Sequence, residues 1–391
     1  MHQMSLKKYE VDILQYKKIK KINHGGCGDV YLVQKISTNE YYAAKVLKDD
    51  TESSRSNEMM REIMVMCTCE HKTIIKFYGY SMKDFEGNNR LTIIMELAKN
   101  GTLQELIFKA MNVRADKSYN DTKKQIISIG IAYSMKVLHR LRIIHRDIKP
   151  GNIFLNEDFL PKLGDFGFSK YCNFGQSTNQ SAICGTNFYM ADEIFNYDYK
   201  YDFKVDVYAF GYLMIEIICD TLHESETKKC KEELYAKFIE KEKNDYIKNL
   251  IQRCLSTNPN ERPTFDEIYE KLSNVDGNYC LGIIDKNEVL DYIYSITSIN
   301  PITDIMLLKL GNEELFYHDN LKNNEISRLK ESIIELQNAK KELLAENENL
   351  DRRVTRLELL FKNLNYGTGR LKNQDFQNFE TLLNNSPTFK N

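Results

Sequence analysis

Hydrophobic and polar residues follow two different patterns along the first 274 residues of the chain. Near the start, short runs of β-branched and aromatic residues are broken by Gly and Asn, which is typical of a small antiparallel sheet. The predicted strands are Lys18–Ile22, Val30–Gln34 and Tyr41–Leu47. Beyond Gly101, apolar residues recur at helical spacing, as from Ile126 to Leu141 after a candidate N-cap at Asp121. Residues 14–274 therefore predict an α+β domain, with strands first and helices second.

One later segment of this domain is apolar on nearly every face. Val207–Cys219 is too short to span a membrane and is flanked by Asp206 and Asp220, so it predicts a helix buried in the core. After residue 274 the pattern is lost. We interpret residues 275–320, which give mixed signals, as a linker with helical segments.

A heptad repeat without Pro or Gly begins near Ile326. Leucine occupies six successive d positions, which are Leu329, Leu336, Leu343, Leu350, Leu357 and Leu364. A strict 3.5-residue period of this length predicts a coiled coil over residues 325–365, with a single amphipathic helix as the alternative. Leucine at d and Asn347 at an a position favour a parallel homodimer, although a different partner chain could supply the second strand. Residues 367–391 have few apolar residues and no period, which predicts a disordered tail.

Composition and charge argue against several classes of protein. Lys and Arg number 54 against 56 Asp and Glu, so the net charge of -2 offers no general basic surface, and we expect no nucleic-acid partner. No run of about 18 apolar residues is present, so no membrane span is expected. Charged residues occupy Met1–Asp12, where a secretory signal would be apolar, and we expect a cytoplasmic protein. The nine cysteines lack zinc-type C-x-x-C pairs and are interpreted as reduced thiols.

A glycine cluster and a strand lysine are the first candidates for chemistry. The stretch from Ile22 to Val30 reads I-N-H-G-G-C-G-D-V, and glycines let backbone N–H groups approach phosphate oxygens closely. Alone it would also suit a flexible hairpin. Lys45 ends an otherwise apolar strand, where a buried ammonium needs a carboxylate partner. Glu62 is the predicted partner, with Glu58 as the alternative.

The strongest signal is H-R-D-I-K-P-G-N over His145–Asn152, followed by D-F-G, which begins at Asp165. These residue types suit phosphoryl transfer from a nucleotide, in which the protein mainly positions the reactants and neutralises charge. Asp165 and Asn152 can hold Mg²⁺, Asp147 can accept the proton of the incoming hydroxyl, and Lys149 can steady the γ-phosphate.

In order and spacing, these motifs resemble the signature set of the protein kinases over about residues 16–272. The resemblance implies a bilobal fold, with a small antiparallel-sheet N-lobe and a helical C-lobe, that uses ATP and Mg²⁺ to phosphorylate protein substrates. It implies catalytic roles for Asp147, Lys149, Asn152 and Asp165, with Asn152 and Asp165 as metal ligands. It places Met95 as gatekeeper and Glu96 to Ala98 as the hinge. The implied nucleotide-binding residues are Asn23, Gly25, Gly28, Val30, Ala43, Lys45, Glu62, Met95, Glu96, Ala98 and Phe154.

The resemblance extends to residues that organise the substrate side. It pairs Arg262 with Glu193 and makes Thr186 a structural hydroxyl near Asp147 and Lys149. It also implies that Arg146 awaits a phosphate on the activation segment, for which the candidates are Ser177, Thr178 and Ser181.

The sequence motifs D-V-Y-A-F-G and N-E-R-P-T-F resemble those of the tyrosine-kinase-like group of serine/threonine kinases. Lys149, two places after Asp147, also favours Ser/Thr hydroxyls, with dual specificity as the alternative. Two departures from the family pattern stand out: Asn23 replaces the first loop glycine, and Asp192 replaces the proline of A-P-E.

Three hypotheses remain from the sequence. The chain is an active serine/threonine kinase, a kinase-like scaffold without activity, or an adaptor that binds nucleotide and acts through its coiled coil. Retention of all the implied catalytic residues favours the enzyme. A coiled-coil homodimer would then bring two kinase domains together and promote trans-phosphorylation.

Overall fold

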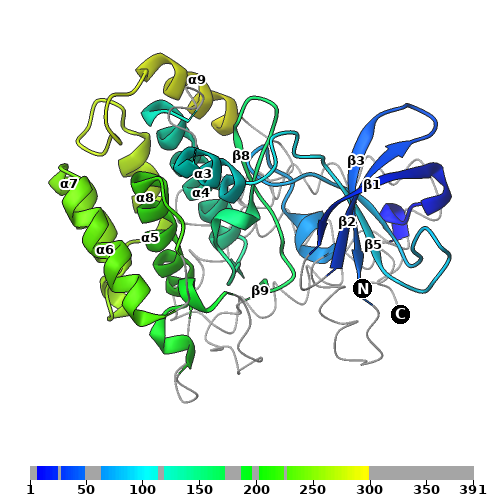
Figure 1. Ribbon diagram of the computed structural model, residues 1–391, viewed down its shortest axis with the longest axis horizontal. Helices are drawn as coiled ribbons and strands as arrows, with labels where there is room; N and C mark the ends of the chain where they lie inside the picture. Colours follow the sequence, from blue (N-terminus) through cyan, green and yellow to red (C-terminus); the bar gives the residue numbers. More distant parts are fainter. Residues whose placement is uncertain are drawn as a thin grey trace, which may run out of the picture. The chain divides into compact units, whose positions relative to one another are not determined.

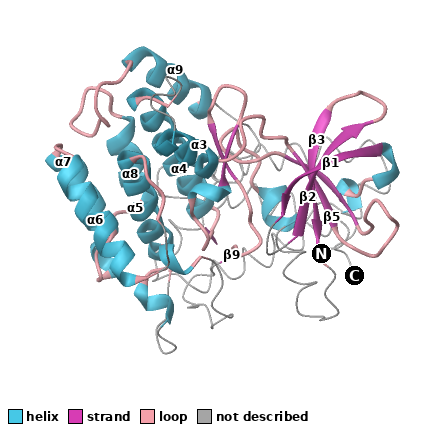
Figure 2. Ribbon diagram, in the orientation of Figure 1, coloured by secondary structure: helices cyan, strands magenta, loops and turns pink. Residues whose placement is uncertain are grey.

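A computed structural model describes most of the chain up to residue 298 (Figures 1 and 2). The described residues are 7–24, 28–48, 63–112, 119–171, 186–195, 202–223 and 227–298. Several residues and segments named above therefore lie outside the described part, namely Gly25, Glu58, Glu62, Ser177, Thr178, Ser181, the predicted coiled coil and the predicted tail.

A five-stranded antiparallel sheet forms the N-lobe, in the order β1-β2-β3-β5-β4. Its strands are β1 (Tyr16–His24), β2 (Gly28–Lys35), β3 (Tyr41–Leu47), β4 (Phe77–Ser81) and β5 (Thr92–Met95). The three strands predicted from the sequence fall within β1, β2 and β3 and are confirmed. Val33 of β2, Tyr42 of β3 and Ile94 of β5 belong to one buried cluster, to which these three neighbouring strands each contribute.

Helices dominate the C-lobe (Figure 2). They are α3 (Leu103–Asn112), α4 (Asp121–Arg140), α5 (Lys204–Cys219), α6 (Lys228–Lys241), α7 (Asp245–Cys254), α8 (Phe265–Ser273) and α9 (Lys286–Thr297). Two small two-stranded sheets pair β6 (Ile143–Ile144) with β9 (Lys170–Tyr171) and β7 (Ile153–Leu155) with β8 (Pro161–Leu163). Short 3-10 helices are η1 (Lys7–Tyr9), η2 (Ile13–Gln15), η3 (Pro150–Asn152), η4 (Asn187–Tyr189), η5 (Asp192–Phe195) and η6 (Pro259–Glu261). Residues 63–68, between β3 and β4, are also helical.

Two helices can be compared directly with the sequence predictions. The predicted buried helix is confirmed within α5, in which every residue from Val205 to Cys219 is buried. The predicted N-cap of α4 is wrong by one position. The side chain of Asn120 accepts a hydrogen bond from the backbone N–H of Lys123, so Asn120 is the cap and Asp121 is the first helical residue. Among the helices that the structure describes, none is long and apolar enough to cross a membrane.

Residues 275–298 pack onto α4 rather than extending away from it. The backbone N–H of Leu281 donates to Gln125 Oε1 at 2.8 Å, and that of Asp285 donates to Thr122 Oγ1 at 2.8 Å. Val289, Tyr292 and Ile296 form the buried face of α9. Figure 1 shows α9 beside the helices of the C-lobe. This part of the predicted linker is therefore folded against the C-lobe.

A glycine makes this packing sterically specific, and alanine at that position is expected to destabilise the protein. A Cβ at Gly130 of α4 would overlap the Tyr292 hydroxyl and the Pro161 ring. Gly to Ala within a helix normally stabilises by up to about 1 kcal/mol. For Gly130→Ala we instead expect a loss of about 1–3 kcal/mol in unfolding free energy from overpacking, measured by urea denaturation.

The matched control combines Gly130→Ala with Tyr292→Leu, which removes the hydroxyl and ring from the overlap. In that background the alanine should cost less than it does alone, because the two side chains are in contact. A Gly130→Ala chain at least as stable as the unaltered protein would contradict this packing.

Candidate active site

Asp147 stands at the centre of the site, in the loop between β6 and β7, and is almost fully buried. Its Oδ2 lies 2.7 Å from Lys149 Nζ and accepts a hydrogen bond from Asn152 Nδ2 at 2.7 Å. Its Oδ1 accepts hydrogen bonds from the Thr186 backbone N–H at 3.0 Å and the Thr186 hydroxyl at 3.1 Å. Lys149 Nζ also donates to Thr186 Oγ1 at 2.8 Å. These contacts fix the carboxylate in one orientation and place Thr186 where the sequence predicted it.

Asp206, in the first turn of α5, binds the backbone of this loop. Asp206 is buried, and its Oδ2 accepts hydrogen bonds from the His145 N–H at 2.9 Å and from His139 Nε2 at 2.9 Å. Its Oδ1 accepts from the Arg146 N–H at 2.8 Å, where Arg146 has a positive φ of 67°. A non-glycine residue with such a φ is held there by its surroundings. The sequence did not indicate the role of His139, which looks like an ordinary polar residue near a helix end.

Asp165 forms an ion pair with Lys45 across the two lobes. Lys45 Nζ lies 2.7 Å from Asp165 Oδ1, and Lys45 is almost fully buried. Burial alone would raise the pKa of Asp165, but the charge and hydrogen bond of Lys45 outweigh it and leave this pKa below its usual value. Asp165 is therefore a carboxylate at neutral pH. The predicted partner of Lys45, Glu62, lies outside the described residues.

His145 connects the loop of Asp147 to the segment that carries Asp165. Its Nε2 donates to the Gly164 carbonyl at 3.2 Å, and its Nδ1 accepts from the Asp147 N–H at 3.3 Å. A Cβ at Gly164 would lie 2.7 Å from the Phe154 ring and 3.0 Å from Ile75. Gly164 is thus a point of close packing next to Asp165.

The strand register brings most of the predicted nucleotide-binding residues into neighbouring positions. Asn23 of β1 is paired with Val30 of β2, and Val30 is paired with Lys45 of β3. Ala43 of β3 is paired with Met95 of β5. Asn23 has no positive φ, so its backbone conformation does not require glycine.

The remaining predicted nucleotide-binding residues in the described part of the chain lie in β2, after β5 and in β7. Gly28 begins β2, where a Cβ would overlap the Val46 carbonyl, so glycine is needed for the close approach of the two strands. Glu96 directly follows β5, and Ala98 lies two residues later. Phe154 of β7 packs against the Gly164 position and so lies near Asp165.

The donor atoms at the site fit Mg²⁺ bound together with nucleotide phosphates. Asn152 Nδ2 donates to the carboxylate and to the backbone carbonyl of Asp147, both at 2.7 Å, which leaves the amide oxygen of Asn152 as the ligand atom. Asp165 supplies a carboxylate. Within the described ranges no group of three or more His, Cys, Asp or Glu side chains could hold a metal alone. A site of one carboxylate and one amide oxygen is typical of Mg²⁺ that shares its coordination with substrate phosphates.

A family model described as the protein kinase domain matches residues 16–272, which is more than half of the chain. The chain belongs to the protein kinase family. The order of the signature motifs and the two-lobed fold agree with this assignment.

Several curated relatives are similar to this kinase. It is 29% identical over 254 residues to serine/threonine-protein kinase A of Trypanosoma brucei brucei, covering 63% of this chain and 57% of that protein. It is 28% identical over 262 residues to serine/threonine-protein kinase PLK1 of Xenopus laevis, covering 65% of this chain and 42% of that protein. It is 32% identical over 221 residues to cysteine-rich receptor-like protein kinase 26 of Arabidopsis thaliana, covering 54% of this chain and 32% of that protein. The kinase thus spans less than two thirds of the length of each of these relatives.

The second departure from the family pattern, Asp192, leaves the neighbouring ion pair intact. Arg262 NH1 and NH2 donate to the two carboxylate oxygens of Glu193 at 2.5 and 3.0 Å. Both side chains are buried in the kinase. Proline is therefore not required at position 192 for this contact to form.

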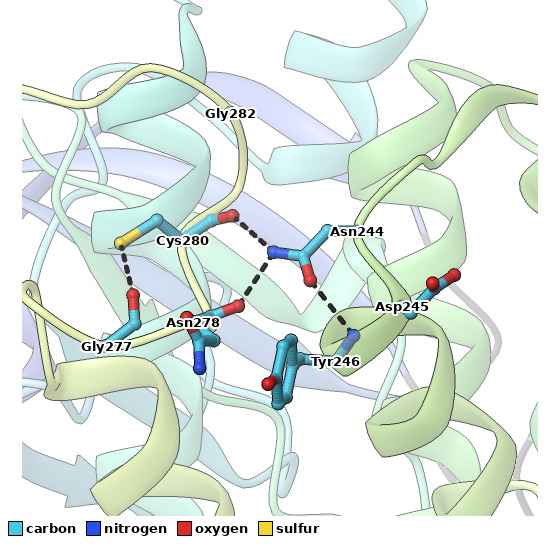
Figure 3. Close-up of a pocket in the computed structure, with 7 residues that line it drawn as sticks. All are labelled: Asn244, Asp245, Tyr246, Gly277, Asn278, Cys280 and Gly282. Carbon is cyan, nitrogen blue, oxygen red and sulfur yellow. Dashed lines mark hydrogen bonds between the residues drawn. The ribbon is translucent and has the colours of Figure 1, made fainter.

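A hollow of about 460 Å³ lies elsewhere in the C-lobe of the kinase, at the start of α7 (Figure 3). The Asn244 amide donates to the carbonyls of Asn278 and Cys280, at 2.7 and 3.5 Å, and Asn244 Oδ1 caps α7 by accepting from the Tyr246 N–H. The Cys280 thiol points to the Gly277 carbonyl, and burial raises its pKa. These contacts join α7 to the loop that precedes α9.

The pH dependence of stability should report on His145. Burial lowers the pKa of its imidazole below the usual 6.5, which outweighs the attraction of the nearby carboxylates. Just below pH 6.5 the unfolded chain therefore binds more protons at this residue than the folded kinase does. From pH 7.5 to 5.5 we expect His145 to lower the unfolding free energy, by up to about 1.4 kcal/mol per pH unit.

The control is His145→Gln, which keeps a donor and an acceptor but cannot titrate in this range. Urea denaturation of both chains at matched pH values measures the difference. The same pH dependence in both chains would contradict the predicted role of this imidazole.

Proposed function

We propose that this kinase transfers the γ-phosphate of ATP to Ser or Thr hydroxyls of proteins. The observation that carries the proposal is the set of contacts around Asp147. The carboxylate is oriented by Lys149, Asn152 and Thr186 and is connected through His145 to the segment that bears Asp165. These contacts support a mechanism in which Asp147 is the base, Lys149 the cation, and Asn152 and Asp165 the metal ligands, as phosphoryl transfer requires.

Each residue has a distinct task in the proposed mechanism. Asp147 orients the substrate hydroxyl and accepts its proton, since its carboxylate is held in place before substrate arrives. Lys149, between Asp147 and Thr186, neutralises charge on the transferred group. Lys45, which forms an ion pair with Asp165, orients the nucleotide phosphates. Asp165 and Asn152 would hold Mg²⁺, which would supply further neutralisation of phosphate charge. The strand positions of Val30, Ala43 and Met95 and the hinge from Glu96 to Ala98 would then enclose the adenine.

The choice of Ser and Thr rests on Lys149 and on the names of two relatives as serine/threonine-protein kinases. The motifs D-V-Y-A-F-G and N-E-R-P-T-F further support placement in the tyrosine-kinase-like group. We also propose a cytoplasmic location. Three peptides that differ only in a Ser, Thr or Tyr acceptor test the assignment. We expect faster transfer to Ser and Thr than to Tyr; equal rates would show dual specificity, and transfer to Tyr alone would contradict the proposal.

We further propose that residues 325–365 form a coiled coil that pairs two kinase domains and promotes trans-phosphorylation. The support is the six-leucine heptad register of the sequence. Light scattering on the full chain should give twice the 45.9 kDa chain mass at tens of micromolar. Leu343→Glu with Leu350→Glu should return the mass of one chain, because charge at d positions opposes pairing.

The control is Glu348→Lys, which changes charge within the same segment but outside the a and d positions. A single-chain mass for the unaltered protein would refute self-association and leave a different partner chain as the explanation.

A further inference from the structure

Helix α9 ends against the segment 71–76, which leads into β4. The last carbonyls of a helix lack partners within the helix and need donors from elsewhere. Lys72 Nζ donates to the Ser295 carbonyl at 2.9 Å, and His71 Nε2 donates to the Ile296 carbonyl at 3.0 Å. The C-terminal end of α9 is therefore capped by two consecutive side chains of a segment more than 220 residues earlier in the chain.

The hydrogen bonds of His71 determine which of its nitrogens carries the proton. A carbonyl only accepts, so Nε2 must be the donor toward Ile296. Nδ1 is then the acceptor and receives the Thr73 N–H at 3.2 Å, with the Thr73 hydroxyl at 2.9 Å. The ring also packs on Tyr133 of α4, with 4.9 Å between centroids. His71 thus joins α9 to the backbone of the 71–76 segment in a defined geometry.

The same segment holds the strand that leads to Asp165. The Leu163 N–H donates to the Thr73 carbonyl at 2.8 Å, and the Ile75 N–H donates to the Leu163 carbonyl at 2.8 Å. Leu163 ends β8, two residues before Asp165. A shift of the 71–76 segment would therefore move the backbone that places this carboxylate.

A second connection runs from this segment to the hinge. Lys162 Nζ donates to the Lys72 carbonyl at 3.2 Å and lies 3.0 Å from Glu96 Oε2. Glu96 also receives the Lys76 N–H on its carboxylate at 3.2 Å and donates its own N–H to the Lys76 carbonyl at 2.9 Å. The residue after Met95 is thus attached to both ends of the 71–76 segment.

We propose that α9, which lies beyond the matched kinase domain, is a positioning element of the nucleotide site. Its C-terminal end holds His71 and Lys72. Their segment in turn holds Glu96 on the hinge side and, on the phosphate side, Leu163 at the end of the strand that leads to Asp165. The inference rests on the proposed function, because it concerns how that function's nucleotide site is ordered. Without the contacts to α9, part of the energy of nucleotide binding would be spent on ordering this segment.

Nucleotide binding by variants of the full chain tests the proposal. Calorimetry measures the Kd of MgATP, and transfer to a generic basic protein gives kcat at saturating ATP. For His71→Leu and for Lys72→Met we expect the Kd to rise about fivefold, with kcat within about twofold of the unaltered chain. His71→Gln should restore most of the affinity, because its amide can donate to Ile296 and accept from Thr73.

The matched control is Lys123→Met, which removes the 2.8 Å ion pair with Glu288 in the first turn of α9. It weakens the attachment of α9 at its other end without touching the 71–76 segment, so the Kd should stay within about twofold. If α9 only stabilised the fold, all these variants would bind MgATP equally weakly. Combining His71→Leu with Glu96→Gln should raise the Kd by less than the product of the single effects, because both act through one connected set of contacts.

The outcomes separate the two proposals. The unaltered kinase could bind MgATP and transfer phosphate while His71→Leu and Lys72→Met leave the Kd of MgATP unchanged. That result would overturn the role of α9 but not the proposed function. Equal losses in these variants and in Lys123→Met would also overturn the role of α9. Unaltered kinase that bound no MgATP would overturn the proposed function, and the role of α9 with it.

Discussion

Asp147→Asn is expected to lower kcat for phosphoryl transfer by about 10²–10⁴-fold while the domain stays folded. Asparagine keeps the size of the side chain but cannot take a proton from the substrate hydroxyl. The loop itself is held independently, through the hydrogen bonds of Asp206 to the N–H groups of His145 and Arg146. Asp165→Asn should have an effect of similar size, because it removes the charge that would bind Mg²⁺.

A matched control is Asp245→Asn, which makes the same chemical change on a side chain that is 92% exposed. It should leave kcat unchanged, and the thermal unfolding of all three variants should show a folded domain. A folded Asp147→Asn or Asp165→Asn chain with nearly full turnover would show that the catalytic residues are assigned wrongly.

Arg262→Met is expected to lower the free energy of unfolding by about 3–5 kcal/mol. The Arg262 side chain is 1% exposed and makes two hydrogen bonds to the Glu193 carboxylate and one each to the Ser256 and Lys204 carbonyls. Methionine fills much of the space but leaves a buried carboxylate without its counter-charge. Chemical denaturation of the full chain measures the loss.

The control is Lys229→Met, which breaks an exposed pair with Glu233 in α6 and should cost less than about 0.5 kcal/mol. Adding Glu193→Gln to Arg262→Met should recover part of the loss, since it removes the unpaired charge. An Arg262→Met chain as stable as the Lys229→Met chain would contradict a structural role for this buried pair.

The proximity of the site residues could be predicted from the sequence because these residues occur in short motifs. His145–Asn152 places Asp147, Lys149 and Asn152 within a few residues, so local backbone geometry alone keeps them close. The three strands and the buried helix could be predicted because periodicity reflects which faces are covered. The N-cap of α4 was missed by one residue, since Asn120 and Asp121 are both good caps and only the folded backbone decides between them.

Contacts between distant parts of the chain could not be predicted in this way. His139 looks like an exposed residue near a helix end, and only the fold brings it to Asp206. The ion pair of Lys162 with Glu96 forms only because the fold brings β8 next to the hinge. The helix α9 gave mixed signals because its buried face is narrow, and its role depends on where its last turn ends.

Transfer of labelled γ-phosphate from MgATP to a generic basic protein by the purified full chain tests the central claim most directly. The assay is read together with MgATP binding on the same preparation and with Asp147→Asn as the inactive reference. We expect the label on Ser and Thr of the substrate, at a rate at least about 10²-fold above that of the reference. A chain that binds MgATP but transfers no more phosphate than Asp147→Asn would contradict the account and identify the protein as a kinase-like scaffold.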